Sequence, residues 1–300
     1  MCDLRGSIVP IITPFKGGQV DHAAFAGLID WQIENGAHGI SVSGTTGEPS
    51  SLSRAERMRL YEVAREAIAG RVPFVPGTGS VNHEETLALS KHAEQTGADA
   101  LLLIAPYYCR PSQQGLFEHF KAVAQAVGIP VILYNIPGRT AVNIEVETVA
   151  RLREACPNIV GVKESNKDFE HINRLLHRMG PEFLVYSGIE LLCYPLLAIG
   201  GAGYISATAN LMPKQINSLY DLCAAGKWEE ARKLHFDMLP LNDAIFYEIN
   251  PVPVKTALAW MGKITFEVRL PLTAMSEANQ QKLRGVMKMY GLGANERNEK

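Results

Sequence analysis

Lys163 directly follows the apolar run Ile159–Val162, and its amine is the most reactive group that the sequence places at a strand end. Burial disfavours the charged ammonium form of a lysine, and a neutral amine in such a pocket attacks a ketone to form a Schiff base. The commoner role of a lysine at a strand end is to extend to water or to pair with a neighbouring carboxylate, here Glu164. Lys163 alone therefore leaves both interpretations open.

Further side chains carry groups that would assist such an amine. Tyr134 lies in the run Pro130–Asn135 and offers a phenol for proton transfer, and general acid–base help of this kind is worth about 10²–10⁴ in rate. Thr45 and Thr46, flanked by glycines, offer hydroxyl and backbone N–H groups to a carboxylate. Arg139 offers a two-pronged donor for a second carboxylate. Each also has an ordinary structural role, as a core aromatic, a turn or a surface arginine.

The elements that would position these groups follow one rhythm of short apolar runs and amphipathic stretches. Strand starts recur about every 20–35 residues, the size of one βα unit. We expect strands at Ser7–Thr13, His38–Ser43, Pro73–Pro76, Ala98–Ala105, Pro130–Asn135, Ile159–Lys163, Phe183–Ser187 and Gly203–Ala207. Most are continuously apolar, which is typical of parallel strands covered on both faces.

Helical patterns fill the intervals. We expect helices at Ala23–Glu34, Ser53–Ala69, His83–Gln95, Gln113–Ala126, Val146–Glu154 and Phe169–Arg178, and then at Pro213–Ala225, Lys227–Ile245, Val252–Gly262 and Glu277–Tyr290. Eight βα units predict an α/β fold, a (β/α)8 TIM barrel over residues 1–225, with a C-terminal helical extension over residues 226–300. A doubly wound sheet is the alternative, but its usual Gly-x-Gly-x-x-Gly after the first strand is absent. Barrel active sites lie where strands end, so the groups named above are expected at one mouth.

Composition excludes several classes of protein. Lys plus Arg number 29 and Asp plus Glu 31, so the formal charge of −2 lacks the basic excess expected of a nucleic-acid-binding protein. No apolar run approaches the roughly 20 residues that span a bilayer, and the start does not read as a secretory signal. The five cysteines are scattered and the histidines form no ligand grouping. We therefore expect a cytoplasmic protein with reduced thiols, no metal, no cofactor and no nucleic-acid or membrane partner.

Several motifs, in order along nearly the whole chain, resemble the dihydrodipicolinate synthase/N-acetylneuraminate lyase family of pyruvate-dependent class I aldolases. The motifs are Ile8–Phe15, Gly44–Glu48, Pro106–Tyr108, Tyr134–Thr140, Val162–Glu164, Asn250–Lys255 and Arg269–Thr273. Their combination is far more specific than any one of them.

The resemblance implies a role for each residue. Lys163 would form the Schiff base with pyruvate. Thr45 and Thr46 would bind the pyruvate carboxylate and join Tyr134 in a proton relay. Tyr108 resembles the family's relay tyrosine, which reaches into the site of the neighbouring subunit. Members of the family are commonly dimers of tight dimers, so the resemblance implies a homotetramer.

Specificity follows from other positions. Arg139 is similar to the arginine that receives the carboxylate of the second substrate, and Gly188 and Ile205 match positions that contribute backbone groups. The chain also departs from the synthase pattern: Cys109 stands where an asparagine is usual, and Ile189 stands where an acidic residue is usual. These departures bear on the identity of the aldehyde.

Three functions follow from these residues. The leading one is a Schiff-base enzyme that joins pyruvate to aspartate semialdehyde. The second is a catabolic aldolase of a hydroxy-oxo diacid such as 2,4-dihydroxyhept-2-ene-1,7-dioate, whose aldehyde also carries a carboxylate for Arg139. The third is a barrel that binds an oxo-acid as a sensor, without turnover. A mere binder has no need for a desolvated amine beside a phenol, which favours an enzyme whose partners are pyruvate and an aldehyde.

Overall fold

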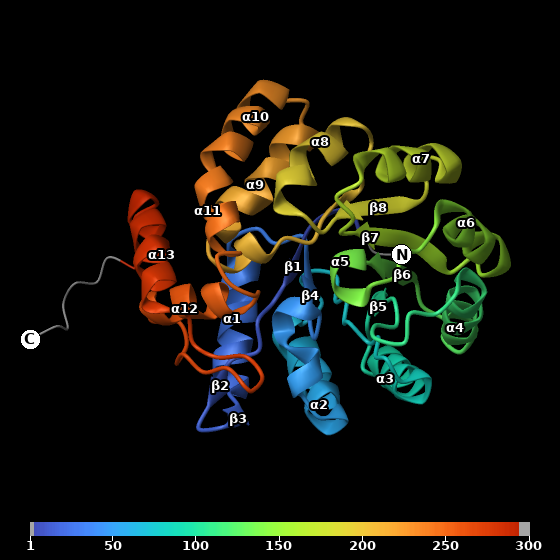
Figure 1. The fold of residues 1–300 in the computed structure, drawn as a ribbon, viewed down its shortest axis with the longest axis horizontal. Coiled ribbons are helices and arrows are strands. Elements are labelled where there is room, and N and C mark those ends of the chain that lie inside the picture. The colour runs from blue at the N-terminus through green and yellow to red at the C-terminus, as the bar shows by residue number, and fades with distance from the viewer. Residues whose placement is uncertain (1–2, 294–300) are drawn as a thin grey trace, which may run out of the picture.

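A sheet of parallel strands forms the centre of the computed structural model, which describes residues 3–293 (Figure 1). Seven strands follow the order β4-β1-β9-β8-β7-β6-β5. They are β1 (Gly6–Pro10), β4 (Gly39–Ser41), β5 (Leu101–Ile104), β6 (Val131–Asn135), β7 (Ile159–Glu164), β8 (Leu184–Ser187) and β9 (Gly203–Tyr204). Nearly all their residues are buried, as expected of parallel strands with side chains packed on both faces.

The segment that joins β4 to β5 closes this sheet into a barrel. Phe74 bridges β4 at Ile40 and Gly77 bridges β5 at Leu102, both in the parallel sense. The sequence predicts a strand at Pro73–Pro76, but the segment forms isolated bridges instead of a regular ladder, because its two prolines have no N–H to donate. The predicted (β/α)8 barrel is confirmed, with seven regular strands and one bridged segment.

A small antiparallel hairpin extends the chain after β1 and is absent from the sequence prediction. It consists of β2 (Phe15–Lys16) and β3 (Gln19–Val20). Gly17 and Gly18 form its turn with φ of 60° and 79°. Two successive positive φ angles are typical of a tight hairpin turn, and glycine adopts them without steric cost.

Eight helices of the described chain cover the outside of the barrel, one after each strand or bridged segment. They are α1 (His22–Glu34), α2 (Arg54–Ile68), α3 (His83–Gln95), α4 (Gln113–Gln125), α6 (Val146–Ala155), α7 (Phe169–Met179), α8 (Cys193–Ala198) and α9 (Pro213–Ala224). Helix α2 begins at a capping box, in which Ser53 and Glu56 exchange side-chain and backbone hydrogen bonds. The sequence does not predict the short helix α8. It also does not predict the short turns η1 (Thr45–Gly47), η2 (Pro49–Ser51), α5 (Pro137–Thr140), η3 (Glu190–Leu192) and η4 (Ala207–Asn210).

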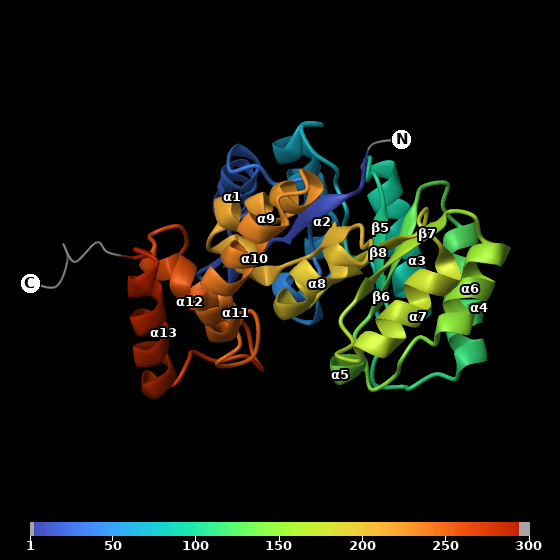
Figure 2. The same ribbon diagram turned by 90° about the horizontal axis from the view of Figure 1, so that it is seen from above.

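The C-terminal helices are α10 (Trp228–Asp237), α11 (Leu239–Ala244), α12 (Val252–Trp260) and α13 (Glu277–Met289). The predicted single helix Lys227–Ile245 is wrong, because Pro240 lacks an N–H and is accommodated only in the first turn of a new helix. Both views place α12 and α13 at one end of the molecule, away from α4 and α6 (Figures 1 and 2). The boundary between residues 225 and 226 stays a prediction. Within residues 3–293, no helix combines the length and apolar character needed to cross a bilayer.

Two hydrophobic cores result from this architecture. The larger one lies between the strands and the surrounding helices. The smaller one fills the inside of the barrel and consists of Leu4, Ile8, Val75, Ala100, Leu102, Ile132, Tyr134, Tyr186, Ala202 and Ile205. The barrel interior is therefore packed, and only its rim is left for a site.

Candidate active site

Lys163 and Tyr134 lie side by side near the carboxyl ends of β7 and β6. They are partners in the β6–β7 register, and they are 6% and 4% exposed. The Nζ atom of Lys163 lies 4.3 Å from the centroid of the Tyr134 ring. A buried amine over a phenol ring combines a nucleophile for a carbonyl group with a carrier for its protons.

A β-bulge in β7 turns Lys163 toward the inside of the barrel. Val131 of β6 pairs with Ile159, but the next residue of β6 pairs with Gly161, so Val160 is an extra residue. Ile159 and Val162 both belong to the outer core although two residues separate them, so the strict alternation of faces is broken between them. After the bulge Lys163 faces the same side as Tyr134, because a shift of one residue exchanges the two faces of a strand.

The Thr45–Thr46 loop leaves β4 as a single 3-10 turn, η1. Thr46 is buried, and its Oγ1 accepts a hydrogen bond of 3.0 Å from Nδ2 of Asn250. The Oγ1 of Thr13 donates to the carbonyl of Gly47 at 2.7 Å and so fixes the end of the loop. The loop that carries both predicted threonines is thus fixed at the mouth of the barrel.

Arg139 lies in α5, directly after β6, and its side chain is exposed. One guanidinium nitrogen donates to the carbonyl of Asn250 at 3.3 Å. Asn250 therefore contacts both the threonine loop and Arg139 through different atoms. The sequence places Asn250 in one of the family motifs but indicates no role for it. Only the fold, which joins positions 204 residues apart, reveals its bridging contact with Thr46.

A cavity of about 240 Å³ opens at this mouth. Of the predicted residues, Thr45, Tyr134 and Arg139 line it, and Lys163 lies over the face of the Tyr134 ring. The lining also includes Tyr107 rather than Tyr108. The remaining lining residues are Ser43, Gly44, Glu48, Pro49, Ser50, Ser51, Arg57, Gly77, Gly79, Leu102, Ile104, Thr140, Ile249, Asn250, Pro251, Arg269, Pro271 and Leu272.

Gly188 and Ile205 lie beside this site without lining the cavity. A Cβ atom on Gly188 would lie 2.6 Å from Cε of Lys163 and would overlap Oγ of Ser165. Only glycine therefore allows the backbone after β8 to pack against the lysine stem. The N–H of Ile205 donates to the carbonyl of Ser187 at 2.8 Å, and its side chain belongs to the inner core.

Tyr108 is 91% exposed and does not line the cavity of its own chain. It adopts a φ of 69°, in the left-handed region that bulky residues rarely occupy. The structure therefore does not bring Tyr108 together with Lys163 and Tyr134 within one chain. Its expected role in the site of a neighbouring subunit stays a prediction.

A buried ion pair behind the threonine loop escapes sequence analysis. Nζ of Lys255 lies 2.5 Å from Oε1 of Glu48, and both side chains are shielded from solvent. Burial raises the pKa of the Glu48 carboxyl and lowers that of Lys255, and the ion pair opposes both shifts. The residues lie 207 positions apart, so no local pattern predicts their contact.

The carboxylate of Glu190 lies close enough to Lys163 for the two groups to interact electrostatically. Glu190 is buried, and its Oε1 accepts a hydrogen bond of 2.8 Å from the N–H of Ala207. Burial raises the pKa of Glu190, while backbone hydrogen bonds, including that from Ala207, and the nearby Lys163 oppose that shift. Among residues 3–293, no group of three or more His, Cys, Asp or Glu side chains is arranged to hold a metal ion.

The site and fold can be compared with known proteins. The model of the dihydrodipicolinate synthetase family matches residues 3–290. The chain belongs to this family. The dihydrodipicolinate synthetase family comprises pyruvate-dependent class I lyases, so both the predicted family and the predicted class of enzyme are confirmed.

Relatives within the family align over almost their whole length. A protein of Thermodesulfovibrio yellowstonii named 4-hydroxy-tetrahydrodipicolinate synthase is 49% identical over 288 residues, which cover 96% of this chain and 99% of the relative. A protein of the same name from Thermus thermophilus is 45% identical over 289 residues, covering 96% and 97%.

Solved structures agree with the computed fold. Dihydrodipicolinate synthase of Aquifex aeolicus matches with a TM-score of 0.95 and 44% identity, covering 97% of this chain and 99% of that one. The enzyme of Thermotoga maritima matches with a TM-score of 0.93 and 39% identity, covering 96% and 99%.

Proposed function

We propose that this protein is a 4-hydroxy-tetrahydrodipicolinate synthase, which condenses pyruvate with aspartate semialdehyde. The observation that carries the proposal is the buried amine of Lys163 over the ring of Tyr134, which lines a cavity together with Arg139. Relatives that share nearly half of the sequence carry this enzyme's name, which supports the same reaction here.

The proposed reaction starts at the amine of Lys163. The neutral amine attacks C2 of pyruvate, and loss of water gives a Schiff base. This cation acidifies the methyl group, which loses a proton to leave an enamine. The enamine carbon attacks the aldehyde carbon of the second substrate, whose oxygen takes up a proton. The amino group of that substrate then adds to C2 and displaces Lys163, which closes the ring and frees the enzyme.

Tyr134 and Thr46 supply the proton relay in this proposal. The oxygen of Thr46 accepts its hydrogen bond from Asn250, so its own O–H proton is free to be donated. Thr45 lines the cavity and would bind the pyruvate carboxylate. Gly188 and Ile205 would add backbone groups around the bound substrate.

Arg139 would receive the carboxylate of the aldehyde. A guanidinium has five N–H donors, and one contact to Asn250 leaves donors for a bidentate bond to a carboxylate. The same contact would serve the aldehyde of a hydroxy-oxo diacid, so the choice between these substrates rests on assay.

We further propose a homotetramer, a dimer of dimers, in which Tyr108 completes the relay of a neighbouring copy. Tyr108 is exposed and does not line the cavity of its own chain, so it is available to a neighbouring copy, which supports this assembly.

A cytoplasmic location stays a prediction. The described cysteines Cys109, Cys156, Cys193 and Cys223 carry free thiols, as is usual in a reducing compartment. The fifth, Cys2, lies outside the described residues.

Borohydride trapping tests the chemistry. Incubation with pyruvate and borohydride should reduce the Schiff base and attach one pyruvate-derived group, which peptide mass spectrometry should locate at Lys163. The variant Lys163→Ala should remain unmodified and inactive. Lys167→Ala is the matched control, because Lys167 is exposed four residues further along and should leave trapping unchanged. Full activity of Lys163→Ala would refute the mechanism.

The aldehyde is tested separately. The enzyme should consume pyruvate with aspartate semialdehyde and turn over succinate semialdehyde, the four-carbon partner of the diacid aldolase, far more slowly. Trapping at Lys163 without turnover of aspartate semialdehyde would exclude the synthase and leave the diacid aldolase as the function to test.

A further inference from the structure

The residues after Tyr134 and Lys163 form a second pair on the opposite face of the same two strands. Asn135 and Glu164 are partners in the β6–β7 register and are 0% and 1% exposed. Nδ2 of Asn135 donates to Oε1 of Glu164 at 2.8 Å. Successive residues of a strand point to opposite faces, so this pair lies outside the barrel wall while the reacting pair lies inside.

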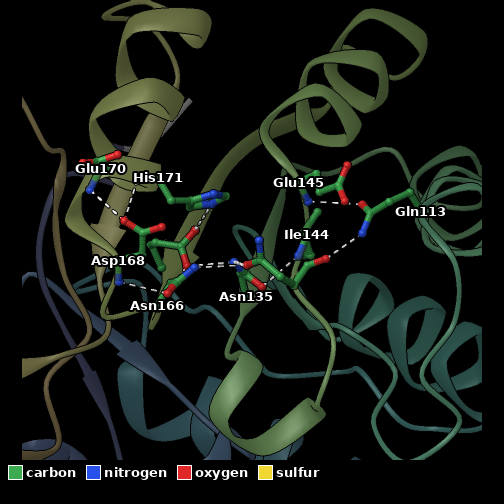
Figure 3. Close-up of polar contacts among 10 residues, drawn as sticks. Gln113, Asn135, Ile144, Glu145, Asn166, Asp168, Glu170 and His171 are labelled. Carbon is green, nitrogen blue, oxygen red and sulfur yellow. Dashed lines mark hydrogen bonds and ion pairs between the residues drawn. The ribbon is translucent and has the colours of Figure 1, made fainter.

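The Asn135 amide is fully used. Its Nδ2 also donates to Oδ1 of Asn143 at 2.7 Å, and its Oδ1 accepts from the N–H of Ile144 at 3.0 Å. Figure 3 shows Asn135 between the segment that carries Ile144 and the segment that carries Asn166. An amide whose two N–H donors and oxygen are all engaged is held in one orientation.

Glu164 is held from three sides. Its Oε1 also accepts the N–H of Asn166 at 3.1 Å, and its Oε2 lies 3.3 Å from Nε2 of His171 on α7. The contact with the Glu164 carboxylate raises the pKa of His171, against the effect of burial. Asp168 caps α7 through the N–H groups of Glu170 and His171, which keeps the ring in place (Figure 3).

The bulge in β7 links the contacts of Asn135 and Glu164 to the orientation of Lys163. If β7 lost the bulge by pairing Val160 with Ile132, a slip of one residue, Lys163 would turn to the helices and Glu164 would enter the barrel. In the slipped register the carboxylate would lose Asn135, Asn166 and His171, and an unpaired buried carboxylate is strongly unfavourable. The native contacts of Glu164 therefore favour the bulged register.

We propose that Asn135 and Glu164 are positioning residues that hold β7 in the register in which Lys163 faces Tyr134. They act through the backbone that joins each of them to its reacting neighbour, and they touch no substrate. This inference rests on the proposed Schiff-base chemistry, and it concerns the rate at which that Schiff base forms.

The test measures the rate of borohydride trapping with pyruvate, kcat and KM. A misplacement of the amine by about 1 Å costs on the order of 100-fold in rate, so Asn135→Ala and Glu164→Ala should each slow trapping and kcat about 100-fold. The KM for pyruvate should change much less, because the groups around its carboxylate remain. Glu164→Gln retains the Oε1 acceptor for Asn135 and Asn166 and should restore most of the rate. The slowing in the double alanine variant should be smaller than the product of the two single effects, because both substitutions remove the contact between Asn135 and Glu164.

Gln113→Ala is the control. Gln113 bonds to the carbonyl of Asn143, the N–H of Glu145 and Thr148 in the same layer, but to neither strand. It should lower the melting temperature while leaving the trapping rate unchanged. If Glu164→Ala does not fold, Asn135→Ala carries the test, because Glu164 there keeps Asn166 and His171 as partners.

The outcomes are distinct. A wild-type enzyme that is not trapped at all would contradict the proposed function itself. A trapped wild type with folded Asn135→Ala trapped at the same rate would overturn the positioning role, and so would an equal slowing in Gln113→Ala.

Discussion

Replacing Lys255 with methionine should destabilise the folded chain by about 3–5 kcal/mol, the usual cost of removing one partner of a buried ion pair. Lys255 is 0% exposed and its Nζ lies 2.5 Å from Oε1 of Glu48. The other oxygen of Glu48 has no hydrogen-bond partner among the described residues. The variant would therefore keep a buried carboxylate that has lost its counter-charge, and that loss dominates the cost.

Urea unfolding, followed by tryptophan fluorescence at one fixed protein concentration, measures this loss. Lys233→Met is the matched control, because Lys233 pairs with Asp237 on the surface of α10 and should leave the midpoint unchanged. Glu48→Leu combined with Lys255→Met removes both charges and should recover part of the stability. A double variant as unstable as the sum of the two single variants would refute the explanation by a lone charge.

The pH dependence supplies an independent check. Burial already raises the pKa of Glu48 above its ordinary value of 4.5, and the loss of Lys255 removes the main opposing influence. The folded variant then binds a proton more tightly than the unfolded chain. Its deficit relative to the wild type should be small near the ordinary pKa and should grow as the pH rises through the folded pKa. A deficit that stays constant between about pH 5 and pH 8 would count against this reasoning.

Two further substitutions follow from the packing. Gly188→Ala should slow trapping at Lys163 by about tenfold or more, because the new Cβ would meet Cε at 2.6 Å, whereas Gly138→Ala, with no atom within 4 Å, should not. Burial, together with the nearby His83, lowers the pKa of His119 to about 4. As the pH falls below 6.5, His119 therefore binds a proton in the unfolded chain but not in the folded chain, which lowers the stability of the folded chain. The urea midpoint should therefore fall between about pH 7.5 and pH 5 and fall less in His119→Gln, and equal losses would show that His119 is not responsible.

Most of the fold can be predicted from the sequence, because each βα unit is specified by residues that are close together in the chain. Apolar runs, capping residues and Pro240 mark where elements begin and end. The closing segment is harder to predict, since its prolines leave bridges instead of a ladder. The hairpin of β2 and β3, by contrast, could have been predicted from the sequence, because the adjacent Gly17 and Gly18 indicate a tight turn.

The site is encoded less locally than the fold. Position at a strand end is enough to select Lys163 and Tyr134 as candidates. Their common orientation depends on the bulge at Val160. Gly161 is the residue of the run Ile159–Val162 whose type is compatible with a bulge, but a glycine in a strand does not specify which residue is extra. The contact of Asn250 with the threonine loop is equally hidden, because the barrel joins segments that are 204 residues apart.

The bulge in β7 also bears on how this enzyme can change by gain or loss of residues. Deleting Val160 would give β7 an uninterrupted ladder with β6, and the barrel would be more regular than it is now. The same deletion would leave Lys163 opposite Tyr134, because Ile159 and Gly161 already pair with consecutive residues of β6. Loss of the bulged residue should therefore be tolerated by the site, whereas a change of length that slips Lys163 by one residue against β6 would turn the amine to the helices and silence the enzyme.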